Sequence, residues 1–582
     1  LTKTTDALVP ITPAIIDAVQ GGEEKAEEKQ EEVAEVAPAA EVAEAAPVAP
    51  VAAPVAQASA PAGVFKLQIG KGENINLEIP LSAFAQQAAQ PAPAAAVVEG
   101  KSAAVAEAAP VAVEAKAEEK HEGESKFIRS LKTKHYKIDK VVFGEKTEIQ
   151  GTTLVLRTPE DLCKEAAESE VLVEDVKLEI ITPDKYDTYS ETIMDVQPIA
   201  VKEEGEIGHG VTRELKGVVM VLTGTDANGV QIGEFGSSEG ELERNIMWGR
   251  PGAPDKGEIF IKGQVTIKAG ANMERPGPLA AHKAFDHITE EIRKALKEVE
   301  DESLVVGDIN IEQYRHPGNK KVLIVKEIMG QGAMHDNLIL PVEPVGTLGA
   351  KPNVDLGNLP VMLAPTEVLD GGIHALTCIG PASKETSRHY YREPLVLEAM
   401  ADEEIDLVGV LLVGSPQANS EKFYVSKRVG MTIEAMDIDG AIVTTEGFGN
   451  NHIDFASHIE EIGKRGVSVV GMTYSAVQGA LVVGNEYMSA MVDNNKSKQG
   501  IENEILSNNT LCKEDAIRAL AMLKTQMGGG TIKKAERKWN PNVKLNNVEV
   551  IEKTTGEKVE LVDNEQVLPK SKKRQEIYEK ED

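Results

Sequence analysis

Three short apolar runs near the C-terminus constrain the fold of this chain more than any other feature. They are residues 407–413 (LVGVLLV), 441–445 (AIVTT) and 467–471 (VSVVG). The segments between them have helical spacing, as in 420–436 and in the apolar series Phe455, Ile459 and Ile462. Strands that are apolar on both faces and alternate with helices predict a parallel sheet covered by helices. We therefore expect an α/β fold in this part of the chain.

The middle of the chain mixes strands and helices. β-Branched residues predict strands at 218–223, 259–268 and 322–328. Between the last two strands, apolar residues recur at spacings of three and four and predict an amphipathic helix; they are Phe285, Ile288, Ile292, Leu296 and Val299. Glycine-dense loops follow several strands, but none has the pattern of a phosphate loop or a dinucleotide fingerprint. We expect a mixed α/β domain with no bound nucleotide.

Composition divides the chain into three parts. From 1 to 125 the sequence consists of short Ala, Pro, Val and Glu repeats, which lack the apolar bulk to offset the entropy of ordering. We expect this part to be flexible and extended, a tether to a partner. One island, 64–80, alternates apolar and polar residues around Gly-Lys-Gly and predicts a β-hairpin, most simply a docking strand pair. The mixed α/β domain then occupies 126–377, and the parallel-sheet domain occupies 378–582.

The chain is strongly acidic, with a formal net charge of −32 at pH 7. Nucleic acids and anionic membranes are bound by clustered Lys and Arg, so we expect neither as a partner. No apolar run reaches the roughly 20 residues that span a bilayer, and we recognise no secretory signal pattern. Three scattered cysteines, at 163, 378 and 512, make neither a disulfide framework nor a zinc site. We expect a cytoplasmic protein without a bound metal.

One cysteine lies in an unusual context, Gly371-Gly372-Ile-His-Ala-Leu-Thr377-Cys378-Ile-Gly-Pro. A thiol preceded by Thr and flanked by Gly and Pro can attack the preceding carbonyl in an N-to-S acyl shift. Elimination from the thioester leaves dehydroalanine, which hydrolyses to a pyruvoyl group. The spacing alone leaves a second interpretation open, in which Cys378 is an inert thiol that packs as a small hydrophobe.

Four polar residues of the middle part are candidates for substrate binding. His335 and Asp336 follow Gly330-Gln-Gly and form a candidate acid/base pair, although a loop histidine bonded to the backbone fits equally. Arg250 and Arg275, each beside Pro and Gly, have the bidentate geometry that a carboxylate requires. Ion pairs within turns are the alternative for both arginines.

Two further candidates lie in the C-terminal part. Asn450 and His452 follow the run 441–445, at the carboxyl edge where open α/β sheets bind ligands. The same edge is predicted to carry residues 414–417, which follow a neighbouring strand. The alternative is that Asn450 and His452 only cap a helix beginning at Asp454.

Long segments of the chain resemble the glycine, sarcosine, betaine and proline reductase family, specifically its proline-reducing branch. They are 224–240, 247–252, 273–282, 326–345, 374–383, 447–458 and 539–547. The resemblance covers the chain from about 126 to its end. It implies that Cys378 is the pyruvoyl precursor and that the chain is cleaved between Thr377 and Cys378.

The resemblance also implies an activity and partners. The pyruvoyl group would activate D-proline, and a selenocysteine-containing subunit would open the ring to 5-aminovalerate. Dedicated redox proteins would then supply electrons, since Cys163 and Cys512 lie in no redox motif. We expect a higher-order oligomer of such an oxidoreductase.

Several alternatives stay open at this point. They are a glycine, sarcosine or betaine reductase component, a pyruvoyl-dependent decarboxylase and a non-enzymatic scaffold. His374, three residues before Thr377, either accepts the thiol proton during cleavage or lines the substrate pocket. Four residues beyond the junction are further pocket candidates: Ser383, His389, Tyr390 and Arg392.

Overall fold

A computed structural model describes residues 124–230, 239–271, 276–328, 338–350, 358–376, 385–416, 418–447, 449–474, 483–494, 505–532 and 552–553. It also describes the backbone of three short strands: β1 (Val64–Ile69), β2 (Ile75–Pro80) and β18 (Lys351–Pro352). The chain divides into two compact units, Leu1–Glu114 and Ala115–Asp582.

The first unit contains the predicted hairpin. β1 and β2 pair antiparallel, in a register that runs from Val64 opposite Pro80 to Ile69 opposite Ile75. The hairpin prediction is therefore confirmed at the level of the backbone.

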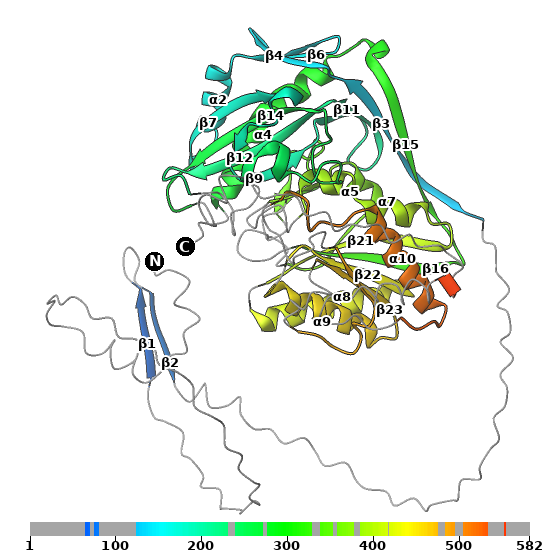
Figure 1. Ribbon diagram of the computed structural model, residues 1–582. Helices are drawn as coiled ribbons and strands as arrows, with labels where there is room; N and C mark the ends of the chain where they lie inside the picture. Colours follow the sequence, from blue (N-terminus) through cyan, green and yellow to red (C-terminus); the bar gives the residue numbers. More distant parts are fainter. Residues whose placement is uncertain are drawn as a thin grey trace, which may run out of the picture. The chain divides into compact units, whose positions relative to one another are not determined.

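Two four-stranded sheets form the first part of the second unit (Figure 1). One has the order β7 (Val173–Ile181), β14 (Ile259–Ile267), β12 (Val218–Asp226) and β9 (Ile193–Gln197). The other has the order β10 (Ala200–Glu204), β11 (Gly210–Lys216), β3 (Lys126–Lys137) and β15 (Val305–Arg315). Each mixes parallel and antiparallel pairs, as expected for a mixed α/β region.

Helix α4 (Pro276–Lys297) packs against the sheet that contains β14. The five predicted core residues, Phe285 to Val299, are all buried. The last of them, Val299, lies just beyond the end of the helix. The remaining small elements here are α2 (Pro159–Glu168), η3 (Pro183–Lys185), α3 (Leu242–Asn245), η4 (Glu302–Leu304), β4 (Lys140–Gly144), β5 (Glu148–Gln150), β6 (Thr153–Arg157), β8 (Tyr189–Ser190) and β13 (Gly240–Glu241).

A six-stranded sheet forms the second part. Its order is β19 (Val361–Leu363), β21 (Ile405–Gly414), β16 (Lys320–Ile328), β22 (Gly440–Thr445), β23 (Ser468–Thr473) and β24 (Met491–Asp493). All neighbouring pairs are parallel except β19 with β21. The predicted parallel sheet is therefore confirmed, with one antiparallel edge strand.

Helices cover both faces of this sheet (Figure 1). On one face lie α8 (Asn419–Met436) and α9 (Asn451–Gly463), which bury Leu323 and Val325 of β16. On the other lie α7 (Pro394–Ala401) and α10 (Lys513–Met527), which pack over Val322 and Ile324. Short helices α5 (Pro365–Leu369) and α6 (Ser387–Tyr391) complete this side.

The central strand of this sheet comes from an unexpected part of the sequence. β16 and β19 both precede Thr377, whereas β21 to β24 follow Cys378. β16 separates β21 from β22, so the two strands predicted to be neighbours are not adjacent. A central strand is favoured at 322–328 because every side chain from Val322 to Ile328 is buried. The junction between Thr377 and Cys378 therefore does not separate one sheet from another.

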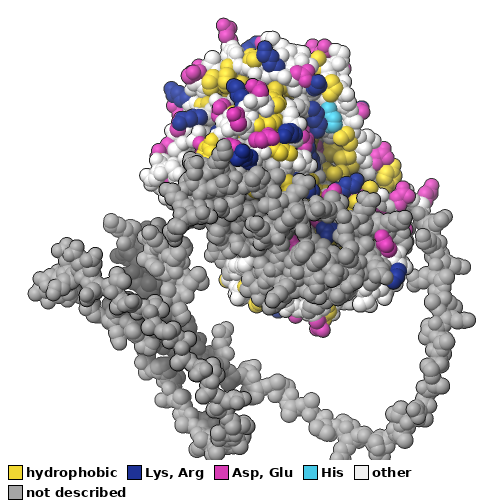
Figure 2. Space-filling model, in the orientation of Figure 1, with side chains coloured by type: hydrophobic (Ala, Val, Ile, Leu, Met, Phe, Trp, Pro, Cys, Tyr) yellow, Lys and Arg dark blue, Asp and Glu magenta, His cyan; other side chains and the backbone are white. Residues whose placement is uncertain are grey.

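The surface of the described residues carries both signs of charge. On the face shown in Figure 2, Lys and Arg side chains are interspersed with Asp and Glu. Among the described helices, none combines the length and the apolar composition needed to cross a membrane.

Candidate functional site

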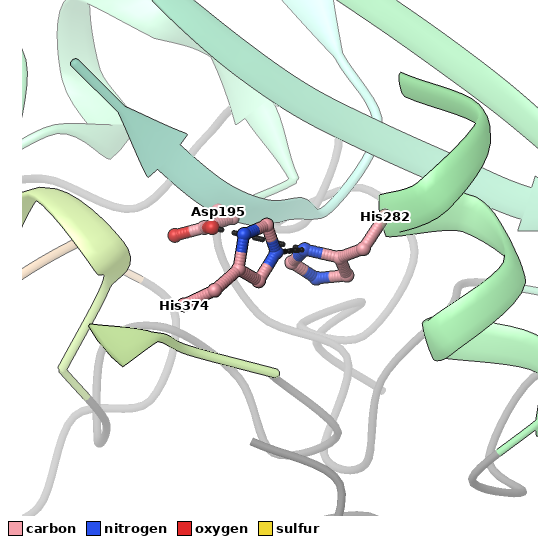
Figure 3. Close-up of side chains that lie close together, drawn as sticks. All are labelled: Asp195, His282 and His374. Atoms are coloured by element: carbon pink, nitrogen blue, oxygen red, sulfur yellow. Dashed lines mark hydrogen bonds and ion pairs between the residues drawn. The ribbon is translucent and has the colours of Figure 1, made fainter. Parts of the chain in front are cut away.

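One histidine of a buried pair lies three residues before the predicted cleavage junction. His374 is on β20 (Ile373–His374), and His282 is on α4. Nδ1 of His282 lies 2.7 Å from Nε2 of His374, and Nδ1 of His374 lies 2.7 Å from the Val345 carbonyl oxygen. Asp195, on β9, places Oδ2 3.8 Å from Nδ1 of His282. Figure 3 shows the three side chains pointing toward one another from separate elements; we call them the histidine cluster.

The spacing of its donor atoms bears on whether the histidine cluster could hold a metal ion. Its donor atoms lie within 4.8 Å of one another, which is compatible with shared coordination. However, the two imidazoles are hydrogen-bonded directly at 2.7 Å. Two nitrogens that share an ion each lie about 2.0–2.1 Å from it and are therefore farther from each other than this. As placed, the two imidazoles are hydrogen-bonded to each other, an arrangement that can pass a proton between two rings.

The carbonyl that holds His374 belongs to a strained residue. Val345 has a φ of +56°, in the left-handed region that β-branched side chains rarely adopt. Its N–H donates to the Gly371 carbonyl at 2.8 Å, while the next turn is held by Thr347 N–H donating to Asp286 at 2.9 Å. Such strain persists only where the surroundings impose it, and it concentrates at functional sites.

The chain around β20 is held on two sides. β20 pairs antiparallel with β17 (Leu338–Ile339), with Leu338 opposite His374. Beyond β20, Ala375 N–H donates to Ser387 Oγ at 2.9 Å, and Ser387 Oγ donates to Asp195 at 2.6 Å. His374, Ala375 and Leu376 are each fully buried. The segment is thus held to within two residues of Thr377.

Asp195 links this anchor to the histidine cluster. Its carboxylate accepts hydrogen bonds from the N–H groups of Val196 and Ser387, from the Gln197 amide and from Ser387 Oγ. Burial raises the pKa of Asp195, and the hydrogen bonds from Ser387 and Gln197 oppose that rise. Asp195 accepts four hydrogen bonds and donates none, which indicates that its carboxyl group is ionised.

A second buried cluster, the glutamate cluster, begins just after the junction. It consists of Lys326, Glu385, His389 and Glu393. Lys326 Nζ lies 2.8 Å from Glu393 and 3.4 Å from Glu385, so an ammonium already fills the place of a cation between the carboxylates. Burial lowers the pKa of His389, but the charge of Glu385 and hydrogen bonds to both glutamates outweigh it and raise that pKa to about 9.

A third buried cluster, the lysine–aspartate cluster, lies at the carboxyl ends of β16 and β21. Lys422 Nζ pairs with Asp454 and lies 3.0 Å from Ser415 Oγ. Burial raises the pKa of Asp454 to about 6. Burial and then the Asp454 charge raise the pKa of Glu327 well above its usual range. Burial and the nearby Lys422 lower the pKa of His458 to about 3, so His458 is neutral. The predicted ligand-binding edge is therefore rich in buried polar groups.

Only some of the predicted site residues lie in the part of the chain that the structure describes. Thr377, Cys378, His335, Asp336 and Arg275 lie outside the described residues. His374 is described, and both of its ring nitrogens are engaged. β17 begins where β20 ends, because the two pair antiparallel. The chain therefore enters β17, just after His335 and Asp336, beside the point where it leaves toward Cys378.

The described residues that were predicted to bind substrate are Arg250, Asn450 and His452. A nitrogen of Arg250 lies 3.9 Å from Glu514, an ion pair of the kind that was the alternative to substrate binding. Asn450 is the N-cap of α9 but makes no side-chain capping bond. His452 is fully buried in the first turn of α9. The helix begins at Asn451, so the expected start at Asp454 is wrong.

Several central residues were missed at the level of sequence. Asp195, His282 and Ser387 are far apart in the chain, and no short motif joins them. His282 ends a segment that carries the family resemblance, 273–282, which was the available signal. Among the four pocket candidates, His389 lies in the glutamate cluster and Ser383 lies outside the described residues, and their role in a substrate pocket stays a prediction.

Known proteins match this chain along its length. The family model described as glycine/sarcosine/betaine reductase component B subunits matches residues 129–506. The D-proline reductase proprotein of Acetoanaerobium sticklandii is 62% identical over all of this chain and 89% of its own length. The sarcosine reductase complex component B subunit alpha of Peptoclostridium acidaminophilum is 27% identical over 58% of this chain and 77% of its own. No solved structure matches. The chain belongs to the family of glycine/sarcosine/betaine reductase component B subunits.

Proposed function

We propose that this chain is the proprotein of a D-proline reductase, which cleaves itself between Thr377 and Cys378 and carries a pyruvoyl group on the new N-terminus. The observation that carries the proposal is its high identity, over the whole chain, to a relative of that name. The sarcosine-type relative is far less similar and matches only part of the chain, which favours the proline-type activity.

The residues beside the junction fit the formation of such a group. The segment from Ile373 to Leu376 is buried and is held by β17, by Ser387 and by the histidine cluster. A scissile bond must be held rigidly for a neighbouring thiol to attack it, because positioning supplies much of the rate of an intramolecular reaction. The pyruvoyl group itself supplies an electrophilic carbonyl that takes up a substrate amine and weakens its Cα–N bond.

The reducing equivalents come from partners in this proposal. The two described thiols, Cys163 and Cys512, are both buried. Burial raises the pKa of Cys163 to about 11, so it is not a ready nucleophile at neutral pH. We assign the attack on substrate to a selenocysteine-containing subunit and the later reduction to separate redox proteins. The names of several relatives, which call them components of a complex, support a multi-subunit enzyme. A reducing cytoplasm suits its thiols.

Substrate binding is assigned on weaker support. His335, Asp336 and Arg275 stay predicted contacts, as do Asn450 and His452. Arg250 would first have to leave Glu514. The lysine–aspartate cluster is at the edge that holds ligands in open α/β sheets, and Asn450 and His452 lie at the start of the helix that carries Asp454, α9.

Intact mass spectrometry tests the proposal directly. We expect two fragments that meet at Thr377 and Cys378, the smaller of which reacts with hydroxylamine or a hydrazine. A single chain with a free thiol at Cys378 would remove the electrophile and favour a scaffold. Cleaved protein is then assayed with its selenoprotein partner and a dithiol, separately on D-proline, glycine, sarcosine and betaine. Turnover of glycine, sarcosine or betaine in preference to D-proline would overturn the substrate assignment.

A further inference from the structure

The lysine–aspartate cluster holds more carboxyl groups than cations. Its ionisable members are Glu327 on β16, Lys422 on α8, and Asp454 and His458 on α9, and all four are buried. Lys422 forms its ion pair with Asp454, and His458 is neutral. Lys422 is also the cation that faces Glu327, but its charge is already matched by Asp454. The carboxyl group of Glu327 therefore has no counter-charge of its own.

The polar atoms of Glu327 and His458 also lack hydrogen bonds. Thr445 and Asn451 lie near the Glu327 carboxyl group, yet neither of its oxygens reaches hydrogen-bond geometry with a described residue. The same holds for both ring nitrogens of His458. Buried polar groups are almost always hydrogen-bonded, so two such side chains in one cluster need an explanation. A ligand that donates hydrogen bonds satisfies them, because an ionised carboxylate can only accept.

The position of the cluster in the sheet favours ligand binding. Three neighbouring parallel strands end at it: β21 leads into Ser415, β16 carries Glu327 one residue before its end, and β22 ends at Thr445. The carboxyl ends of parallel strands are where open α/β sheets bind their ligands. Buried carboxyl groups with displaced pKa values, as in Glu327 and Asp454, are also typical of functional sites.

The charge and spacing of these groups indicate what the ligand is. Two carboxylates and one ammonium require one further positive charge, which a monovalent cation supplies and a divalent metal exceeds. Among the described residues, three or more donor atoms gather within 4.8 Å only in the histidine cluster and in Glu385, His389 and Glu393. A protonated amine carries one charge and donates charge-assisted hydrogen bonds of about 2.7–2.9 Å, so it meets both requirements.

We infer that the lysine–aspartate cluster binds the protonated amine of a small ligand, with Glu327 as its counter-ion and His458 as a further acceptor. Lys422 and Asp454 keep their own ion pair. That the amine is the ring nitrogen of D-proline rests on the proposed function. The site then recognises the substrate by its ammonium group, and its carboxylate is bound elsewhere.

The test measures binding to the full chain with Cys378→Ala, which removes the thiol from which the proposed pyruvoyl group derives. The chain then stays in one piece, as in the structure, and binding does not depend on covalent chemistry. Calorimetry compares three probes: D-proline, pyrrolidine and tetrahydrofuran-2-carboxylate. Pyrrolidine keeps the ring amine without a carboxylate, and the third probe has oxygen in place of the ring nitrogen. We expect D-proline and pyrrolidine to bind and tetrahydrofuran-2-carboxylate not to bind.

Glu327→Gln, added to this chain, keeps the shape of the side chain but removes its charge. We expect the Kd of pyrrolidine to rise by about 30-fold or more, the usual loss when one partner of a buried charge pair is removed. Glu460→Gln is the matched control, because Glu460 lies on α9 with Asp454 and His458 but is exposed. It should bind pyrrolidine as tightly as the parent chain. Thermal denaturation checks the folding of each variant.

A second measurement needs no variant at position 327. Burial and the Asp454 charge raise the pKa of Glu327, so its carboxyl group holds a proton that the amine replaces. Binding of pyrrolidine should therefore release protons, counted by titration in two buffers of different ionisation enthalpy, and should tighten from pH 6 to pH 8. Asp454, with a pKa of about 6, and Lys422 are the other charged groups that face Glu327.

The outcomes separate this inference from the proposed function. Unchanged pyrrolidine binding by folded Glu327→Gln overturns the inference, as does pyrrolidine binding without proton release or pH dependence. Displacement of pyrrolidine by potassium chloride, but not by choline chloride at equal ionic strength, would assign the site to an alkali cation and also overturn it. Pyrrolidine binding through Glu327 without D-proline binding would leave the amine site in place and contradict the substrate of the proposed function.

Discussion

Lys326 and Glu327 are consecutive residues of β16, yet their side chains lie in different buried clusters on opposite faces of the six-stranded sheet. Lys326 pairs with Glu393 at 2.8 Å, on the face covered by α7 and α10. Glu327 lies near Asp454 and Lys422, on the face covered by α8 and α9. The alternation of side chains along a strand produces this separation. The carboxyl end of the central strand is therefore charged on both faces, where most of such a sheet is apolar.

Removal of the Lys326 charge should destabilise the protein strongly. In Lys326→Met, the carboxylates of Glu385 and Glu393 stay buried with only His389 to compensate them. Breaking a buried pair in this way costs about 3–5 kcal/mol. Lys320→Met on the same strand is the control, because Lys320 pairs with Asp439 at 3.1 Å but its side chain is 55% exposed. Urea denaturation of both variants measures the difference, and equal losses would contradict it.

Stability should also depend on pH through His389. Its pKa is raised from 6.5 to about 9, and Glu385, Glu393 and Lys326 are the charged groups that face it. A raised pKa contributes stability that is complete below pH 6.5 and is lost as the pH rises through 9. The contribution is on the order of 3 kcal/mol. The free energy of unfolding, measured from pH 6 to 10, should fall over this window. His389→Gln should flatten the curve, and an equally steep fall in that variant would assign the effect elsewhere.

Much of the fold could be predicted because its elements are strongly periodic. The run 407–413 became β21, and the series Phe455, Ile459 and Ile462 lies buried in α9. The position of β16 was not predictable, since a buried apolar strand is compatible with any interior place in any of the larger sheets. Its insertion between β21 and β22 depends on contacts between residues on either side of the junction.

Less of the candidate site than of the fold could be predicted from the sequence. His374 could be predicted, because it lies within a distinctive segment around Cys378. Asp195 and His282 could not, because their proximity to His374 arises from the packing of α4 and β9, and no spacing rule describes it. The sign of the Val345 backbone angle likewise depends on tertiary contacts with Gly371.

Gly371 should be needed for the geometry of the histidine cluster. Its φ is +75°, and a Cβ added there would lie 2.7 Å from Val345 N. Gly371→Ala must therefore displace Val345 and the carbonyl that holds His374. We expect cleavage to slow and the midpoint of thermal unfolding to fall. Gly466→Ala is the matched control, since Gly466 has a φ of +79° with nothing within 4 Å of the added Cβ. The two variants share backbone strain, so equal cleavage by both would contradict a special role for Gly371.

The unit that spans Ala115–Asp582 should stay folded as one body even when the chain is divided at the junction. β16, from before Thr377, pairs with both β21 and β22, from beyond Cys378. Co-expressed fragments 1–377 and 378–582 should therefore co-purify and elute together in native size-exclusion chromatography. They should separate only at urea concentrations that also abolish the far-UV circular dichroism of the sheet.

Expressed alone, fragment 378–582 lacks the central strand and exposes the edges of β21 and β22. Unpaired apolar edges of this kind drive aggregation, so we expect the fragment to be insoluble. A fragment that ends before β16, such as 1–318, is the control partner and should not rescue it. A soluble, monomeric 378–582 would show that the C-terminal sheet closes without β16, and the single-body interpretation would then be wrong.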